Sequence, residues 1–153
     1  MVSSLYCSSS PVFRSLIIVT FQKEEKMTEK KKFHTDKAGV SGGPYSQATI
    51  HNGIIYVSGQ GAIDPATNEI SLGSIEHETR LAMENLRIIL EEAGSSLDQT
   101  LTITAYLLDM QDYAGFNAVY KSCFNGDLPA RTCIRAAELP FDTRVEVTAT
   151  AYL

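Results

Sequence analysis

Residues 74–93 read SIEHETRLAMENLRIILEEA, and this stretch decides the fold. Apolar or small side chains recur through it at the spacing of one helical face. They are Ile75, Thr79, Ala82, Leu86, Ile89 or Leu90, and Ala93. Glu76 and Glu78 suit the positive N-terminal end of a helix dipole, and Gly94 suits the C-terminal end. The stretch therefore predicts one long amphipathic helix.

A β-hairpin is expected ahead of this helix. The small turn His51-Asn52-Gly53 precedes the apolar run Ile54-Ile55-Tyr56-Val57, and Asn-Gly is the strongest short hairpin signal. Residues 59–68, with two glycines and the sequence Asp64-Pro65-Ala66-Thr67-Asn68, are typical of a turn-rich loop. Two strands are therefore predicted within residues 50–58.

The sequence after the first helix predicts a strand, a second helix and two more strands. Residues 101–108 are typical of a half-buried strand. Residues 112–124 repeat apolar side chains at helical spacing, with Asp109 or Asp112 as a cap. Strands are expected at 130–137 and 144–152, the latter alternating in polarity. This order predicts an α+β sandwich in which two helices cover one face of one sheet.

Size, charge and cysteine content limit the function classes. A chain of 153 residues with 44% hydrophobic residues forms one domain with a real core. The net charge of -5 gives no general attraction for nucleic acid. The three cysteines, Cys7, Cys123 and Cys133, form no disulfide framework and favour a reducing, cytoplasmic compartment. The three histidines are widely spaced, and no metal site is expected.

Residues 1–26 differ from the rest and are expected to lie outside the fold. They are rich in serine, and their apolar run at 16–19 is too short to span a bilayer. A mitochondrial transit peptide would carry several arginines, whereas Arg14 stands alone. Met27 is a second candidate start. The segment is thus an extension that is disordered, removed or upstream of the true start, and the single domain is expected over residues 27–153.

The last two strands carry a mixed polar surface. We expect Arg131, Cys133, Arg135, Glu146 and Thr148 on the sheet face opposite the helices. A face open to solvent would be more uniformly charged. The mixed face therefore predicts packing against other subunits, with pockets between them.

Arg131 and Glu146 are the candidate catalytic residues. A guanidinium at the start of a strand can hold a carboxylate through two hydrogen bonds, although it could also pair with a neighbouring Asp or Glu. A carboxylate at Glu146 could accept a proton from water, although it could also be a solvated surface group.

Three further motifs give weaker indications of a functional role. Tyr45 lies in the rigid turn Gly42-Gly43-Pro44-Tyr45-Ser46-Gln47 and could close over a small ligand or pack on the core. Ser58-Gly59-Gln60-Gly61 allows close approach of backbone to a ligand, but lacks the features of a nucleotide-binding loop. Cys133 has no histidine near in sequence to activate it, which favours a structural thiol.

Four stretches, taken in order, closely resemble the RidA/YjgF family of reactive intermediate deaminases. They are Gly43-Pro44-Tyr45-Ser46-Gln47, Val57-Ser58-Gly59-Gln60, Pro129-Ala130-Arg131-Thr132-Cys133 and Val145-Glu146-Val147. The resemblance covers the chain from about Gly43 to its end. It implies a chorismate-mutase-like α+β fold, a homotrimer, and active sites in clefts between subunits.

The resemblance also implies roles for individual residues. Arg131 would bind the substrate carboxylate, and Glu146 would position the attacking water. Cys133 would contribute mainly through its backbone. Tyr45 and Asn117 would line or close the cleft, and Ser58 would lie near its wall.

The activity implied is hydrolytic deamination of 2-imino or 2-enamino acids, such as 2-iminopropanoate, to 2-keto acids and ammonia. It needs no metal or organic cofactor and would follow a pyridoxal-phosphate dehydratase, with no membrane or nucleic-acid partner. An endoribonuclease that inhibits translation, or a non-catalytic ligand-binding or chaperone-like trimer, are the alternatives. Arg135, Glu138 and Thr148 depart from the common family pattern, which leaves the preferred imine open.

Overall fold

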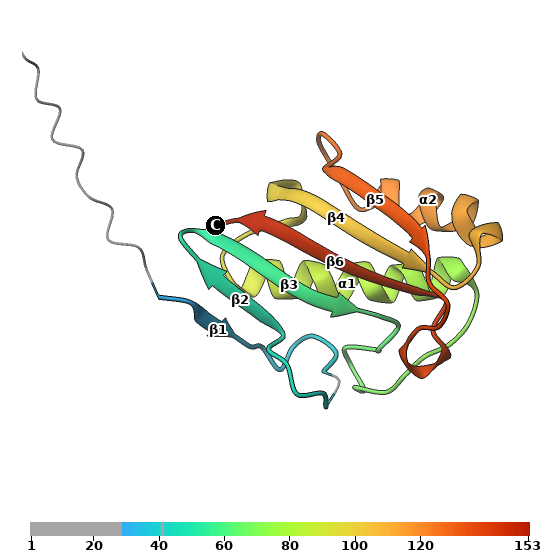
Figure 1. The fold of residues 1–153 in the computed structure, drawn as a ribbon, viewed down its shortest axis with the longest axis horizontal. Helices are drawn as coiled ribbons and strands as arrows, with labels where there is room; N and C mark the ends of the chain where they lie inside the picture. Colours follow the sequence, from blue (N-terminus) through green and yellow to red (C-terminus); the bar gives the residue numbers. More distant parts are fainter. Residues whose placement is uncertain (1–28, 41) are drawn as a thin grey trace, which may run out of the picture.

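The computed structural model describes residues 29–40 and 42–153, so the expectations for residues 1–26 lie outside it. One six-stranded sheet, in the order β1-β2-β3-β6-β4-β5, carries two helices on one face (Figure 1). The elements are β1 (Lys31–Phe33), β2 (Ala48–His51), β3 (Ile54–Gln60), α1 (Ile75–Glu92), β4 (Thr100–Leu107), α2 (Tyr113–Ser122), β5 (Ala130–Arg135) and β6 (Val145–Tyr152). The predicted α+β architecture is confirmed. No helix in the described ranges is long and apolar enough to cross a membrane.

The long helix α1 forms where the sequence predicts it. Ser74 caps its first turn, since the Ser74 side chain accepts a hydrogen bond from the backbone N–H of His77 at 3.3 Å. At the other end Gly94 adopts φ +88, and Ser95 N–H donates to the Leu90 carbonyl at 2.8 Å. This is a Schellman motif, which satisfies carbonyls at the helix end.

The β2–β3 hairpin is also confirmed. Its turn residues Asn52 and Gly53 have φ of 49 and 73, the positive values that a type I′ turn requires. Strand β3 then pairs with β6, and the register shifts between Val57 and Gln60. This irregularity brings Gly59 against the side chain of Glu146.

The central strand β6 joins the two halves of the sheet. It pairs antiparallel with β3 on one side and with β4 on the other. Its residues Val145, Val147, Ala149 and Ala151 are buried toward the helices. Because side chains alternate along a strand, Glu146 points to the opposite, helix-free face of the sheet.

Strand β5 corrects one expectation. It pairs in parallel with β4 only, so that Arg131 lies beside Ile103, Cys133 beside Ala105 and Arg135 beside Leu107. Those β4 residues are buried under the helices, and paired residues point to the same side. Arg131, Cys133 and Arg135 therefore lie on the helix side, and only Glu146 and Thr148 of the predicted set lie on the helix-free face.

The reason for this error is physical. A period of two shows that side chains alternate, but it does not say which set faces the helices. β5 is an edge strand that the helices cover only in part, so polar side chains are tolerated on its helix side. The edge strand β1, which has only three residues, was not predicted because it is too short to show alternation.

Candidate active site

The predicted site residues fall into two groups in the described chain. The first, called the arginine site, consists of Arg131 and Cys133 on β5 with the facing side chains of α2. The second, called the glutamate cleft, is a hollow around Glu146, Tyr45 and Ser58. The two groups lie on opposite sides of the sheet.

Three aromatic rings of α2 hold the guanidinium of Arg131. Its central carbon lies 4.5 Å from the ring centre of Tyr120, 5.2 Å from that of Phe116 and 5.8 Å from that of Tyr113. Arg131 also donates a hydrogen bond from Nη2 to the Tyr113 hydroxyl at 3.3 Å. Positions 113, 116 and 120 share one helical face, so α2 presents the rings together. Cation–π contacts of this kind fix the orientation of an arginine.

Arg131 has no carboxylate partner within residues 29–40 and 42–153. The ion pairs in that part of the chain use His34, Lys37, Arg87 and Arg144 as their cations. The alternative that Arg131 pairs with a neighbouring Asp or Glu therefore does not hold within the chain. An oriented, half-exposed guanidinium without an anion is suited to bind a carboxylate ligand.

Cys133 and Asn117 lie near the arginine site. Cys133 is half-buried two residues after Arg131, and burial raises the pKa of its thiol more than nearby Arg131 lowers it. A protonated thiol is a poor nucleophile, which supports the interpretation of Cys133 as a structural residue. Asn117 is one turn after Tyr113 on α2, and spacing places it on the same helical face.

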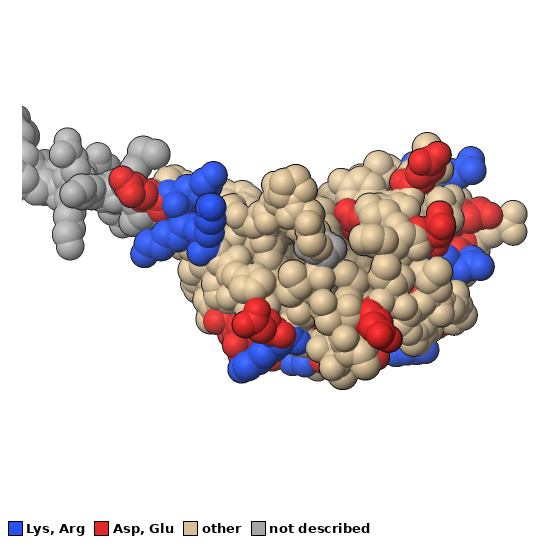
Figure 2. All heavy atoms as spheres, turned by 90° about the horizontal axis from the view of Figure 1, so that it is seen from below, with Lys and Arg blue, Asp and Glu red and all other residues tan. Residues whose placement is uncertain are grey.

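The glutamate cleft has a volume of about 890 Å³. Its walls come from the loop before β2, from the end of β3 with the residues that follow, and from the loop that leads into β6. These loops lie at the lower edge of the sheet in Figure 1, and Figure 2 shows mostly uncharged atoms across the middle of that side. The described residues of one chain contribute no lysine, arginine or aspartate to this lining.

Ser58 fastens one wall of the cleft. Its hydroxyl donates to the Ser46 carbonyl at 2.7 Å, and its N–H donates to the Gln47 carbonyl at 3.0 Å. Both contacts tie the turn that carries Tyr45 to strand β3. Ser58 thus holds the wall, while Tyr45 itself is 52% exposed at the cleft.

Glu146 is the acidic group in the described lining of the cleft. It is half-buried and makes no hydrogen bond or ion pair with any other described residue. Burial raises the pKa of its carboxyl above the ordinary value. A β-carbon added at Gly59 would lie 2.0 Å from Glu146 Oε1, so glycine is needed at position 59 to leave space for this side chain.

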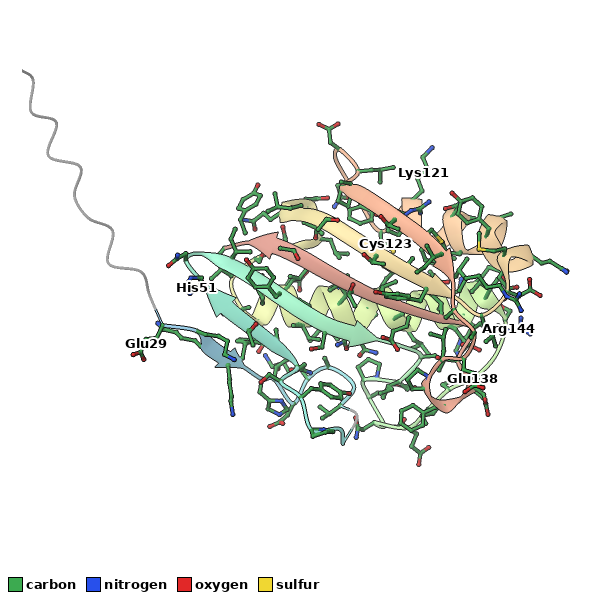
Figure 3. All side chains as sticks on the ribbon, viewed as in Figure 1. Glu29, His51, Lys121, Cys123, Glu138 and Arg144 are labelled. Carbon is green, nitrogen blue, oxygen red and sulfur yellow. The ribbon has the colours of Figure 1, made fainter. Side chains whose placement is uncertain are left out.

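Arg144 and Glu78 connect the two groups within one chain. Arg144 donates to an Asp112 carboxylate oxygen at 3.0 Å and to the Gly73 carbonyl at 3.1 Å. Asp112 directly precedes α2. Arg144, which is labelled in Figure 3, lies two residues before Glu146 and directly precedes β6. Buried Glu78 accepts the Arg144 N–H at 2.6 Å. These bonds fix the start of β6 relative to α2.

Sequence reasoning missed some of these contributions. The spacing in residues 112–124 predicts a helix but not the contact of its aromatic rings with Arg131. Phe116 and Tyr120 are buried, whereas Tyr113 is 40% exposed. The shared helical spacing of the three rings was the available signal. Phe141 also lines the cleft, and a loop residue of this kind has no periodic signal. Within the described ranges no three His, Cys, Asp or Glu side chains gather as a metal site would require.

Comparisons with known proteins identify the family of this chain. The family model described as Endoribonuclease L-PSP matches residues 35–153. A RutC family protein of Pyrococcus abyssi is 43% identical over 80% of this chain and 97% of its own length. The mouse protein named 2-iminobutanoate/2-iminopropanoate deaminase is 39% identical over 80% of this chain and 90% of its own length.

A solved structure gives the same result for the fold. The crystal structure of a putative endoribonuclease L-PSP from Entamoeba histolytica has a TM-score of 0.78 and 39% identity, and covers 82% of this chain and all of that one. The match to the family model spans strands β2 to β6, both helices and the four stretches that carry the sequence resemblance. The chain therefore belongs to the RidA/YjgF family, the group that the endoribonuclease L-PSP family model describes.

Proposed function

We propose that this chain is a hydrolase that deaminates reactive 2-imino and 2-enamino acids. The observation that carries the proposal is the guanidinium of Arg131, oriented by three aromatic rings and without a carboxylate partner in the described chain. Such a group is suited to the carboxylate of a 2-imino acid. The name of the mouse relative supports the same reaction.

The complete site needs more than one copy of the chain. Arg131 and Glu146 lie on opposite faces of the sheet, on strands separated by two strand spacings, or about 10 Å. A three-carbon imino acid cannot reach both groups across the sheet. We therefore propose that Arg131 of one copy and Glu146 of another face the same substrate, in the homotrimer that the family resemblance implies.

The helix-free face is the surface we assign to this assembly. Tyr56, Ile134 and Tyr152 are nearly half exposed there. Between β3, β4 and β6 the same face is lined by the hydroxyl side chains of Thr102, Thr104, Thr148 and Thr150. A sheet face that is apolar and hydroxylic, with little charge, is suited to burial against another subunit.

In the proposed mechanism, Arg131 holds the substrate carboxylate and so fixes the C=N carbon close to the Glu146 of the neighbouring copy. Glu146 accepts a proton from water while the water oxygen bonds to that carbon. Glu146 passes this proton to the substrate nitrogen, which gives a carbinolamine. The hydroxyl proton of the carbinolamine then moves to the nitrogen through Glu146, the C–N bond breaks, and ammonia leaves as the C=O bond of the 2-keto acid forms. The overall reaction consumes one water and releases one ammonia per imine.

A trapping assay tests the proposal. A dehydratase would generate 2-iminopropanoate in the cuvette, and semicarbazide would trap the imine that remains. We expect the wild-type protein to suppress the trapped product, and Arg131→Ala and Glu146→Gln each to lower the rate by about 10²-fold or more. Full activity in Arg131→Ala would show that the assignment of the carboxylate site is wrong.

The alternative of an endoribonuclease has less support in the cleft. Among the described residues the lining contains a single histidine, His34, so the cleft of one chain offers no pair of histidines to act as acid and base on RNA. That activity would be favoured if the wild-type protein cleaved RNA but did not hydrolyse the imine, and if Glu146→Gln abolished the RNA cleavage.

A further inference from the structure

Phe141 is held at the cleft in a strained backbone conformation. It has φ 61 and ψ 22, and the next residue, Asp142, has φ 57. Two consecutive residues other than glycine in this left-handed region cost about 1–3 kcal/mol each. Thr143 opposes this cost, since its N–H and hydroxyl both donate to the Pro140 carbonyl, at 3.3 and 3.1 Å.

The strained turn exposes an aromatic ring instead of burying it. Phe141 is 55% exposed and lines the same cleft as Tyr45 and Glu146. Removing a large apolar side chain from water is favourable, so a ligand that covers the exposed ring of Phe141 would be stabilised by that contact. Strain of this kind is concentrated at ligand-binding sites.

The remaining walls of the cleft are uncharged and partly apolar. Val40, Ala62 and Ile63 contribute aliphatic groups, and Glu146 is the one carboxylate among the described lining residues. Among the described residues of one chain, a charged substituent would find no ionisable partner here besides Glu146, His34 and Tyr45. An apolar substituent would find two exposed rings and several aliphatic side chains.

The geometry of the proposed reaction assigns one substrate group to this space. The carboxylate is held by Arg131 of another copy, and the water and the nitrogen occupy the reacting centre beside Glu146. The side chain of the imino acid is the group left for the rest of the cleft. In one chain, this part of the cleft is lined by the exposed rings of Phe141 and Tyr45 and by aliphatic groups, so the side chain of the imino acid would lie against apolar surface.

We propose that the preferred imino acid carries a large apolar or aromatic side chain, which binds against Phe141 and Tyr45. This inference rests on the proposed deaminase function and names its substrate class. Phe141 is then a specificity-determining residue. It contacts the side chain of the substrate and takes no part in proton transfer.

The test compares two imines on the full-length protein. An amino acid oxidase would generate the imines of phenylalanine and of alanine, and semicarbazide would trap what remains. Phe141→Asn removes the ring but keeps the backbone conformation, because asparagine tolerates positive φ. Phe141→Tyr keeps the ring. Leu72→Asn is the matched control, since Leu72 is 53% exposed and lies outside the cleft lining.

We expect the wild-type kcat/KM to be higher for the phenylalanine imine. Phe141→Asn should lower kcat/KM for that imine by about tenfold or more, while the value for the alanine imine changes by less than about twofold. Phe141→Tyr and Leu72→Asn should retain the wild-type ratio. An unchanged ratio in Phe141→Asn, or a wild-type preference for the alanine imine, would overturn this inference alone. No activity on either imine would overturn the proposed function itself.

Discussion

Replacing Gly59 by alanine is the sharpest test of Glu146. The added β-carbon would lie 2.0 Å from Glu146 Oε1 and 2.5 Å from its carboxyl carbon. Ordinary contact begins at 3.4 Å, so the carboxylate oxygen must retreat by about 1.4 Å. The φ of Gly59 lies outside the left-handed region, so alanine adds no backbone strain there.

The expected effect is a loss of catalysis in a protein that still folds. A displacement of about 1 Å at a reacting group can cost about 10²-fold in rate, and we expect kcat to fall by that amount. Because the displaced group is the end of a flexible side chain, the free energy of unfolding should change by less than about 1 kcal/mol. The trapping assay measures the first quantity, and urea unfolding measures the second.

Two comparisons isolate the cause. Gly61→Ala is the matched control, since the nearest atom to its β-carbon would be the Val145 carbonyl oxygen at 3.7 Å, and kcat should stay within about threefold of wild type. Gly59→Ala combined with Glu146→Gln should be no slower than Glu146→Gln alone, because both act on one group. A folded Gly59→Ala protein with full kcat would refute a catalytic role for the observed position of Glu146.

Three further predictions concern stability and assembly. Because burial raises the pKa of Glu146, its charged form destabilises the fold; the cost is absent below pH 4.5 and appears as pH rises through the raised value. The free energy of unfolding of Glu146→Gln should therefore increase relative to that of wild type as the pH rises from 4 to 8, as measured by urea unfolding. A difference that stays constant across that range would contradict the assignment. Asn85 is 1% exposed and bonds to Gly39 N–H and the Ile63 carbonyl, both at 2.7 Å, so Asn85→Ala should cost about 2–3 kcal/mol by urea unfolding; a loss below about 1 kcal/mol would show that these bonds contribute little. Thr148→Glu should reduce both the mass by light scattering and the activity, whereas Lys121→Glu on the exposed side of α2 should leave both unchanged; a wild-type mass in Thr148→Glu would exclude that face as the interface.

Much of the fold follows from local sequence patterns. The helical spacing in residues 74–93, the Asn52-Gly53 turn and the alternation in β6 each point to one structure, and the chain adopts it. These signals are local because helix packing, turn conformation and strand burial depend on neighbouring residues. β1 could not be found in this way, since its three residues are set by pairing with β2.

The site was predicted less completely because it depends on pairing between distant strands. Arg131, Glu146, Tyr45 and Ser58 were identified individually, mainly through the family resemblance. Their grouping was not, because it follows from β5 pairing with β4 and not with β6. The strained turn at Phe141 and the close approach of Gly59 to Glu146 are tertiary features without a signal in spacing or composition.

The separation of Arg131 from Glu146 has a genetic consequence. If each catalytic centre takes these two residues from different copies, two inactive variants can complement one another in a mixed oligomer. In an equal mixture of Arg131→Ala and Glu146→Gln chains that exchange freely, about one centre in four would combine both intact groups. Two alleles that each abolish activity alone would then restore part of it when expressed together.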